Sequence, residues 1–427
     1  MEKQNITKGK GDYMKPVKGA VLLGQSGGPT SVINASAAGV FLTALDSEHV
    51  TGVYGGVHGI KGILNEDFYD MAKEDRKELE LLKNTPSSAI GSVRYKLADP
   101  AVDDTDYTRL LEVFKKYNIR YFFYNGGNDS MDTANKINQF MNDSGWEMRV
   151  MGVPKTIDND LNITDHSPGY GSAARYVATT FMELYHDATV YDIPQVTIVE
   201  VMGRHAGWLT AASQLAKELG QGPDLIYLPE QPFDIDVFNR RIKEVLEEKG
   251  KVLVAVSEGV QTADGKFIPE LLGTVKRDSF GHAQLGGTAH ILAEEVEKNT
   301  GVKVRPIEFS LMQRSAAHLA SKVDVEEAFN VGKLAVEHAI NGVTGKMVGF
   351  KRLSSAPYEI EYILIPLTEA ANTEQKVPVE WILPNGEGLT QDFVDYAMPL
   401  IQGDGGVVYE NGLPRFANLK KVRVEKK

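Results

Sequence analysis

One unit recurs along this chain: an apolar run, then a glycine-rich or polar loop, then a helical pattern of apolar residues. It occupies residues 17–45, 119–141 and 195–219, and two further apolar runs end in polar residues within 149–161 and 251–260. Alternating strands and helices are typical of parallel α/β sheets. Ligands bind at the carboxyl ends of such strands, so the polar residues there are candidates for a site.

The grouping of these units predicts two lobes. The strand ends in the first part of the chain suggest one lobe, and the later strands suggest a second. We expect a flexible leader over 1–17, a first lobe over 18–169 that is completed by 313–345, a second lobe over 170–312, and a C-terminal extension over 346–427, where the pattern is less regular.

Composition argues against several classes of protein. The chain contains no cysteine, which excludes disulfides, thiolate catalysis and cysteine-ligated metals and fits a reducing compartment. Its net charge of −12 argues against a nucleic-acid surface, although a local pocket can still attract small anions. The N-terminus lacks the apolar core of a secretory signal, and no apolar run approaches the length of about 20 residues that spans a bilayer. We expect a cytoplasmic protein with no nucleic-acid or membrane partner.

Glycine pairs end two of the predicted strands. Gly27 and Gly28 lie in "GQSGGPTS", which is neither a Walker A loop nor a dinucleotide fingerprint. The second pair precedes Asn128, Asp129 and Ser130. Each loop alone fits a tight turn, but two such pairs at strand-to-helix junctions favour a phosphate site, because glycine lets backbone N–H groups approach an anion.

The segment "GVPKTIDNDL" places Asp158 and Asp160 two residues apart, with Lys155 just before them. In an extended loop, residues two apart share a face, so both carboxylates can point at one small volume. Crowded carboxylates raise one pKa and suit a general base, and a lysine can offset charge on a transferred phosphoryl group. The alternative is a solvated polar turn; with Pro154 and Lys155 ahead of it, we favour the functional interpretation.

Charged residues also follow the later apolar runs. An arginine at a strand end suits a phosphate, and a glutamate suits sugar hydroxyls. Each is individually more often structural or a surface charge. The positions are Met202, Gly203, Arg204, Glu258, Arg305 and Arg314.

Taken together, these motifs resemble the phosphofructokinase family over residues 18–345. The matching pieces are "SGGPTSVINA", "GSVRYKL", "GGNDS", "PKTIDND", "VEVMGR", "SEG", "KRDSFGHAQLGG" and "QRS". The resemblance implies an α/β protein of two Rossmann-like lobes with mainly parallel sheets and an active site in the cleft between them. It also implies a reversible kinase reaction on fructose 6-phosphate, Mg²⁺ as cofactor, and a homo-oligomer, either dimer or tetramer.

The resemblance assigns roles to single residues. Asp158 would deprotonate the 1-hydroxyl of the sugar and Asp160 would support it. The remaining implied roles fall into three groups: the acceptor sugar phosphate is held by Thr156, Ile157, Met202, Gly203, Arg204, Glu258, Arg305 and Arg314; the donor phosphates by Gly27, Gly28 and Arg94; and magnesium by Asn128.

Two positions predict the phosphoryl donor. Users of ATP in this family carry glycine where this chain has Asp129 and Lys155. A carboxylate at the first position would occupy the space of the α-phosphate of ATP and repel its negative charge. A lysine at the second position would contribute charge stabilisation to a donor that has no nucleotide. Both match the pyrophosphate-dependent branch, in which the donor is pyrophosphate and the lobe of residues 18–169 binds it.

Three departures leave alternatives open. Asn128 stands where the family usually has an aspartate that contacts magnesium, Gln195 where relatives often have an arginine that reaches a neighbouring subunit, and Leu311 where histidine or tyrosine is common. Asn128 motivates the alternative of a catalytically weak regulatory subunit, whereas Gln195 and Leu311 leave the identity of the acceptor and the contacts between subunits open. A further alternative is an ATP-dependent enzyme of the same fold, against which Asp129 and Lys155 argue.

Overall fold

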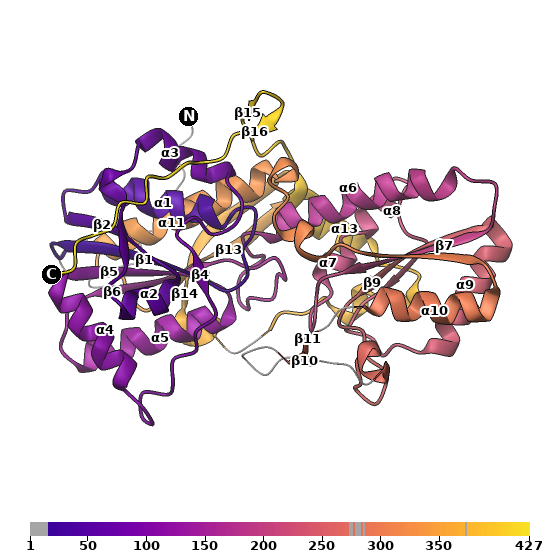
Figure 1. Ribbon diagram of the computed structural model, residues 1–427, viewed down its shortest axis with the longest axis horizontal. Coiled ribbons are helices and arrows are strands. Elements are labelled where there is room, and N and C mark those ends of the chain that lie inside the picture. Colours follow the sequence, from indigo (N-terminus) through magenta and orange to yellow (C-terminus); the bar gives the residue numbers. More distant parts are fainter. Residues whose placement is uncertain (1–15, 273–275, 278–282, 285–286, 372–373) are drawn as a thin grey trace.

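The computed structural model describes residues 16–427 except 273–275, 278–282, 285–286 and 372–373. The expected leader therefore lies almost wholly outside the described residues. The rest forms two α/β lobes, each built around its own sheet (Figure 1). The prediction of a mainly parallel α/β fold is confirmed.

The larger sheet has eight strands in the order β14-β13-β6-β5-β1-β2-β3, with β4 paired to β1. All its pairs are parallel except β2 with β3 and β13 with β14. Its strands are β1 (Gly19–Ser26), β2 (Val50–Gly56), β3 (Phe68–Asp70), β4 (Ser92–Val93), β5 (Ile119–Gly126), β6 (Arg149–Pro154), β13 (Lys346–Ser355) and β14 (Tyr358–Pro366). Its helices are α1 (Ile33–Leu45), α2 (Gly59–Leu64), α3 (Arg76–Leu81), α4 (Thr105–Lys116), α5 (Asn128–Asp143), α11 (Lys322–Ile340) and α12 (Leu367–Ala370).

The smaller sheet is wholly parallel, in the order β12-β7-β9-β8. Its strands are β7 (Gln195–Val201), β8 (Leu225–Tyr227), β9 (Lys251–Ser257) and β12 (Lys303–Glu308). The helices of this lobe are α6 (Tyr170–Thr189), α7 (Trp208–Ala211), α8 (Gln214–Lys217), α9 (Ile235–Lys249), α10 (Thr288–Thr300) and α13 (Gln391–Ala397). Two short antiparallel pairs complete the strands: β10 (Lys276–Arg277) with β11 (Ala283–Gln284), and β15 (Tyr409–Glu410) with β16 (Leu413–Pro414).

Helix α11 returns to the first lobe and packs against α1. The contact is close because glycines face backbone: a Cβ on Gly332 would lie 2.0 Å from the carbonyl oxygen of Ser36, and one on Gly39 would lie 2.1 Å from that of Phe329. Only glycine fits at either position without moving a helix.

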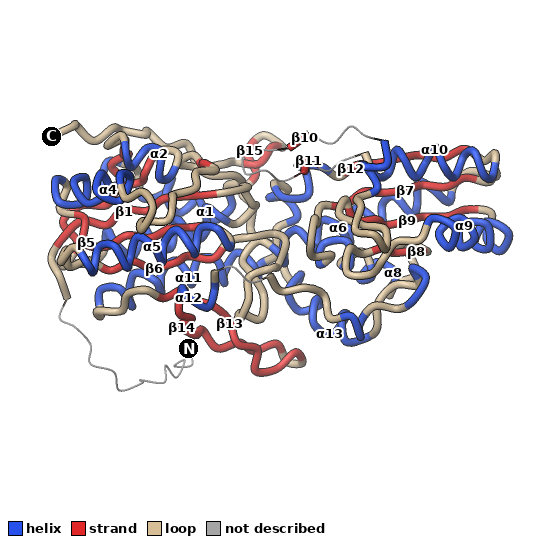
Figure 2. The backbone as a smooth tube through the Cα atoms, turned by 90° about the horizontal axis from the view of Figure 1, so that it is seen from below, coloured by secondary structure: helices blue, strands red, loops and turns tan. Residues whose placement is uncertain are grey.

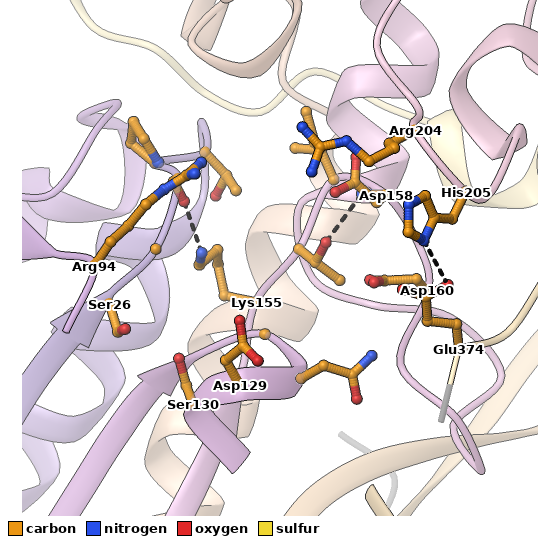
Figure 3. A pocket seen from close by; sticks show the side chains of 18 of the residues that line it. Ser26, Arg94, Asp129, Ser130, Lys155, Asp158, Asp160, Arg204, His205 and Glu374 are labelled. Carbon is orange, nitrogen blue, oxygen red and sulfur yellow. Dashed lines mark hydrogen bonds and ion pairs between the residues drawn. The ribbon is translucent and has the colours of Figure 1, made fainter. Parts of the chain in front are cut away.

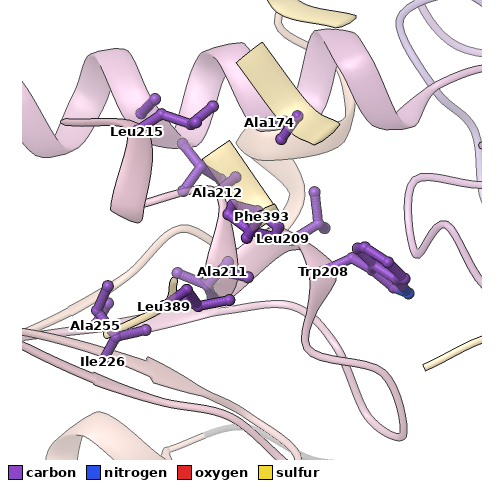
Figure 4. Packing of buried hydrophobic residues seen from close by; sticks show 14 of the residues in the cluster. Ala174, Trp208, Leu209, Ala211, Ala212, Leu215, Ile226, Ala255, Leu389 and Phe393 are labelled. Carbon is purple, nitrogen blue, oxygen red and sulfur yellow. The ribbon is translucent and has the colours of Figure 1, made fainter. Parts of the chain in front are cut away.

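Residues 346–427, the expected C-terminal extension, contribute elements to both lobes. Strands β13 and β14 extend the larger sheet at one edge (Figure 2), because apolar residues such as Met347 and Phe350 are buried there. Helix α13 completes the core of the smaller lobe, where Phe393 packs beside Trp208 (Figure 4). The final residues run back along the first lobe, where the Val424 N–H donates to the Phe68 carbonyl.

Among the described helices, none is both long enough and apolar enough to cross a membrane.

Candidate active site

A pocket of about 410 Å³ lies where the carboxyl ends of the two sheets meet. Adjacent strands bring its walls together: β1 pairs with β5, and β5 pairs with β6, so the loops after these strands are neighbours. The lining residues are Ser26, Gly27, Gly28, Pro29, Thr30, Arg94, Tyr95, Lys96, Leu97, Gly127, Asn128, Asp129, Ser130, Asp132, Thr133, Lys155, Thr156, Ile157, Asp158, Asp160, Met202, Arg204, His205, Ala206, Glu258, Arg314 and Glu374.

The first glycine pair lies directly against two cations. Gly27 has a φ of 75°, and a Cβ there would lie 3.2 Å from Lys155 Nζ. A Cβ on Gly28 would lie 3.0 Å from Arg314 Nη1. Backbone conformation therefore favours glycine at position 27, and the small size of both residues leaves room for the two positive side chains beside them.

Lys155 is buried in the centre of the pocket, with 4% of its surface exposed. Its Nζ donates to the Gly28 carbonyl at 2.6 Å. Burial lowers the pKa of Lys155 to about 8, an effect that Asp158 and Asp160 oppose. The side chain carries its charge at neutral pH and is poised to lose it in mild alkali.

Asp158 and Asp160 both line the pocket, as expected, but the loop between them is not extended. Asn159 has a φ of 55°, in the left-handed region. Our premise of an extended loop is wrong, and the two carboxylates reach one pocket by way of this turn. The Asp158 N–H donates to Thr156 Oγ1 at 3.0 Å, which fixes the start of the loop.

The surroundings of Asp158 favour its protonated form. Burial raises the pKa of Asp158 to about 7, and Asp160 adds to the rise, while Lys155 and Arg204 oppose it. The pKa of Asp160 is also raised, mainly by burial. A carboxyl group that exchanges its proton near neutral pH is suited to general-base chemistry.

Residues that follow β7 and β9 form the wall from the smaller lobe. The Gly203 N–H donates to Glu258 Oε1 at 3.3 Å, and burial raises the pKa of Glu258 to about 7. The Met202 N–H donates to Gln313 Oε1 at 3.2 Å. Gly203 does not line the pocket itself, but its φ of 141° makes the turn that places Met202 and Arg204 there.

Two arginines expected at one phosphate lie apart. Arg314 lines the pocket, and burial together with Arg94 lowers its pKa. Arg305 does not line it; Nη1 donates to Asp187 Oδ2 at 3.1 Å instead. The reason is register: Arg305 pairs with Thr197 in the middle of β7, three residues before β12 ends at Glu308.

The other two departures from the family pattern, Gln195 and Leu311, both lie outside the pocket. Gln195 is buried, and its Nε2 donates to the Ala188 carbonyl at 2.6 Å. Leu311 is 56% exposed and does not line the pocket.

Several lining residues were not predicted from the sequence. Lys96 stands two residues after Arg94 in "GSVRYKL", so its place in that motif was a usable signal. His205 and Glu374 form an ion pair, with Nδ1 and Oε2 3.3 Å apart, and lie on the opposite side of the two aspartates from Arg94 (Figure 3). Glu374 lies in the irregular C-terminal segment, where nothing in the pattern marks it.

Comparison with known proteins gives consistent matches. The family model described as "Phosphofructokinase" matches residues 20–339. A protein of Xanthomonas campestris named pyrophosphate–fructose 6-phosphate 1-phosphotransferase is 45% identical, covering 96% of this chain and 98% of its own. A protein of the same name from Halomonas elongata is 44% identical, covering 94% and 96%. The crystal structure of a pyrophosphate-dependent phosphofructokinase from Nitrosospira multiformis matches with a TM-score of 0.87 at 39% identity, covering 96% and 98%.

Proposed function

The chain belongs to the phosphofructokinase family, and from this premise we propose that it transfers a phosphoryl group from pyrophosphate to the 1-hydroxyl of fructose 6-phosphate. The products are fructose 1,6-bisphosphate and phosphate, and the reaction is reversible. The names of the relatives from Xanthomonas and Halomonas describe this activity.

The choice of donor rests on one observation: Asp129 and Lys155 line the same pocket as Gly27 and Gly28. Asp129 lies in the first turn of α5, where a helix N-terminus would otherwise attract a phosphate. Its carboxylate repels the α-phosphate of ATP. Lys155 lies against the Gly28 carbonyl and supplies positive charge to a donor that has no nucleotide to hold.

Proton transfer is assigned to the aspartates. Asp158 accepts the proton of the 1-hydroxyl, and the neighbouring Asp160 keeps the proton affinity of Asp158 high. As the oxygen attacks the terminal phosphorus, Lys155 stabilises negative charge on the phosphoryl oxygens. Arg204, Glu258 and Met202 hold the sugar phosphate, while Thr156 and Ile157 line the acceptor.

We assign the binding of substrate phosphate groups to arginine side chains. Arg94 and Arg314 provide positive charge on the same side as the glycine pair. Arg305 has no part in this proposal, because it lies outside the pocket and pairs with Asp187.

The residues present fit Mg²⁺. Asn128 Oδ1 and Asp160 Oδ1 are buried, and neither has a hydrogen-bond partner within the described residues. Oxygen atoms of this kind are what the cation prefers. No group of three or more acidic or histidine side chains in the described part of the chain is arranged to hold a metal, so Asn128 and Asp160 would hold the ion together with substrate oxygens and water. When bound, Mg²⁺ would neutralise charge on pyrophosphate.

A coupled assay that compares pyrophosphate with ATP, each with and without magnesium, tests the proposal. We expect product with pyrophosphate and magnesium, and little with ATP. Activity that survives complete chelation would remove the metal from the proposal, and preference for ATP would overturn the assignment of the donor. Formation of homo-oligomers and a cytoplasmic location stay predictions from the family resemblance.

A further inference from the structure

The family match ends at residue 339, yet residues beyond it contact the loop that carries both aspartates. Two contacts from different parts of the C-terminal segment meet this loop. The Gln375 N–H donates to the Asp160 carbonyl at 2.8 Å, and Glu374 forms a β-bridge with Leu161. Helix α13 provides the second contact, through Tyr396.

The hydroxyl of Tyr396 is fully used in this contact. It accepts a hydrogen bond from Asn159 Nδ2 at 2.7 Å and donates one to the Asp165 carbonyl at 2.8 Å. Arg352, on β13, fixes the tyrosine in turn: Nη1 donates to the Tyr396 carbonyl at 2.8 Å, and the guanidinium lies 4.7 Å from the centre of the ring. The hydroxyl, the ring and the backbone carbonyl of Tyr396 therefore all have defined contacts.

Asn159 is the residue between the two aspartates, and it is 1% exposed. Its amide makes two hydrogen bonds: Oδ1 accepts from the Ser167 N–H at 2.9 Å, and Nδ2 donates to Tyr396. The φ of 55° is a conformation that non-glycine residues adopt at a cost, and such a conformation persists only where the surroundings fix it. The directions of the Asp158 and Asp160 carboxylates depend on this turn.

We propose that Tyr396 is a positioning residue for catalysis, which acts through Asn159 to hold Asp158 and Asp160 in their reactive geometry. The C-terminal segment is therefore part of the catalytic apparatus and not only of the fold. The inference rests on the proposed role of Asp158.

The test is Tyr396→Phe, which removes the hydroxyl and leaves the ring in the core. A displacement of about 1 Å at a reacting group can cost 10²-fold in rate, so we expect kcat to fall roughly 10- to 100-fold. KM for both substrates should stay close to wild type, because the lost interaction orients the base and does not hold substrate. The matched control is Tyr362→Phe, since the Tyr362 hydroxyl accepts from Asn330 Nδ2 at 3.1 Å and does not touch the loop. Its kcat should equal that of wild type.

A double-mutant cycle identifies the route. Asn159→Gly removes both amide hydrogen bonds but accepts the positive φ. If Tyr396 acts through Asn159, the double variant should be no slower than Asn159→Gly alone. Wild-type kcat in Tyr396→Phe, or effects that multiply in the double variant, would overturn the inference. Asp158→Ala separates the two proposals: if it is inactive while Tyr396→Phe is normal, only the positioning role fails, whereas an active Asp158→Ala removes the assigned base itself.

Discussion

Asp158 owes its proposed role to its neighbours more than to its own chemistry. An exposed aspartate is a weak base, but this one is buried beside a second carboxylate and a lysine, and its pKa rises to about 7. The same burial lowers the pKa of Lys155 to about 8. Base and cation therefore titrate within a narrow range around neutrality.

Replacement of the base is the most direct test at this scale. Asp158→Ala should lower kcat by about 10²- to 10⁴-fold, the usual value of general-base assistance. KM should change much less, because Asp158 is assigned to proton transfer. Circular dichroism of the purified variant checks that the fold is intact. Near-normal kcat would exclude Asp158 as the base.

The pH profile follows from the same two residues. Asp158 must be deprotonated to accept a proton, so kcat/KM should fall as the pH decreases below about 7. Lys155 must be charged, so kcat/KM should also fall as the pH rises above about 8. Lys155→Arg should remove the alkaline decrease, because arginine stays charged, although at a lower maximum. An alkaline decrease that persists unchanged in this variant would assign it to another group.

The choice of donor is also decided by single residues. Asp129→Gly should allow ATP to bind, because both volume and like charge are removed. Lys155→Gly should reduce the pyrophosphate rate severely, since charge stabilisation of this kind is worth about 3 kcal/mol. The measurement is kcat/KM for both donors in wild type, the two single variants and the double variant. The assignment fails if ATP binding is unchanged in Asp129→Gly.

At the scale of elements, a buried histidine joins three parts of the chain. His166, in the loop after β6, contacts Asp165 at 2.8 Å and Glu327 of α11 at 2.7 Å, and its ring stacks on Phe350 of β13. Arg352 pairs with Asp165 from the same strand. This cluster fixes α11 and β13 against the segment that leads away from the catalytic loop.

The cluster predicts a loss of stability in alkali. Burial alone would lower the pKa of His166, but Glu327 and Asp165 outweigh it and raise the pKa from 6.5 to about 9. Because the folded state binds the proton more tightly, the stabilisation is complete below pH 6.5 and is lost as the pH rises through 9. The unfolding midpoint in urea should therefore decrease over this range in wild type and less so in His166→Gln. His49→Gln, at a partly exposed surface position, is the control. An identical pH dependence in wild type and His166→Gln would contradict the prediction.

At the scale of the whole molecule, the chain passes between the lobes several times. Along the chain, α11, β13 and β14 of the first lobe come after the strands of the smaller lobe, and α13 then returns to the core of the smaller lobe. The pocket takes residues from both lobes. Neither lobe is complete without the C-terminal segment.

This connectivity predicts that the lobes unfold together. Trp146 packs with the first lobe, and Trp208 and Trp381 with the smaller one. Variants that retain only Trp146, or only the other two, would report on each lobe by fluorescence in urea. We expect each variant to show a single fluorescence transition. Its midpoint should equal the midpoint measured by circular dichroism on the same variant. A fluorescence midpoint that differs from circular dichroism would show that the lobes unfold independently.

The sequence by itself determined the parts that depend on consecutive residues. Strand, loop and helix follow from local periodicity, so the mainly parallel α/β fold was predictable from the units at 17–45 and 119–141. The glycine pair at Gly27 and the segment from Lys155 to Asp160 carry their chemistry within a few positions, and the family resemblance rests on them.

Only the tertiary structure decided what depends on residues far apart in the chain. Arg305 and Arg314 look equivalent in sequence, but Arg305 lies in the middle of β12, outside the pocket, whereas Arg314 lies in the turn that follows this strand and lines the pocket. Glu374 and Tyr396 reach the catalytic loop, at Leu161 and Asn159, from more than 200 residues away, which no local pattern encodes. The pKa of Asp158 is likewise set by burial between two lobes, because desolvation is a property of the packed molecule and not of the peptide.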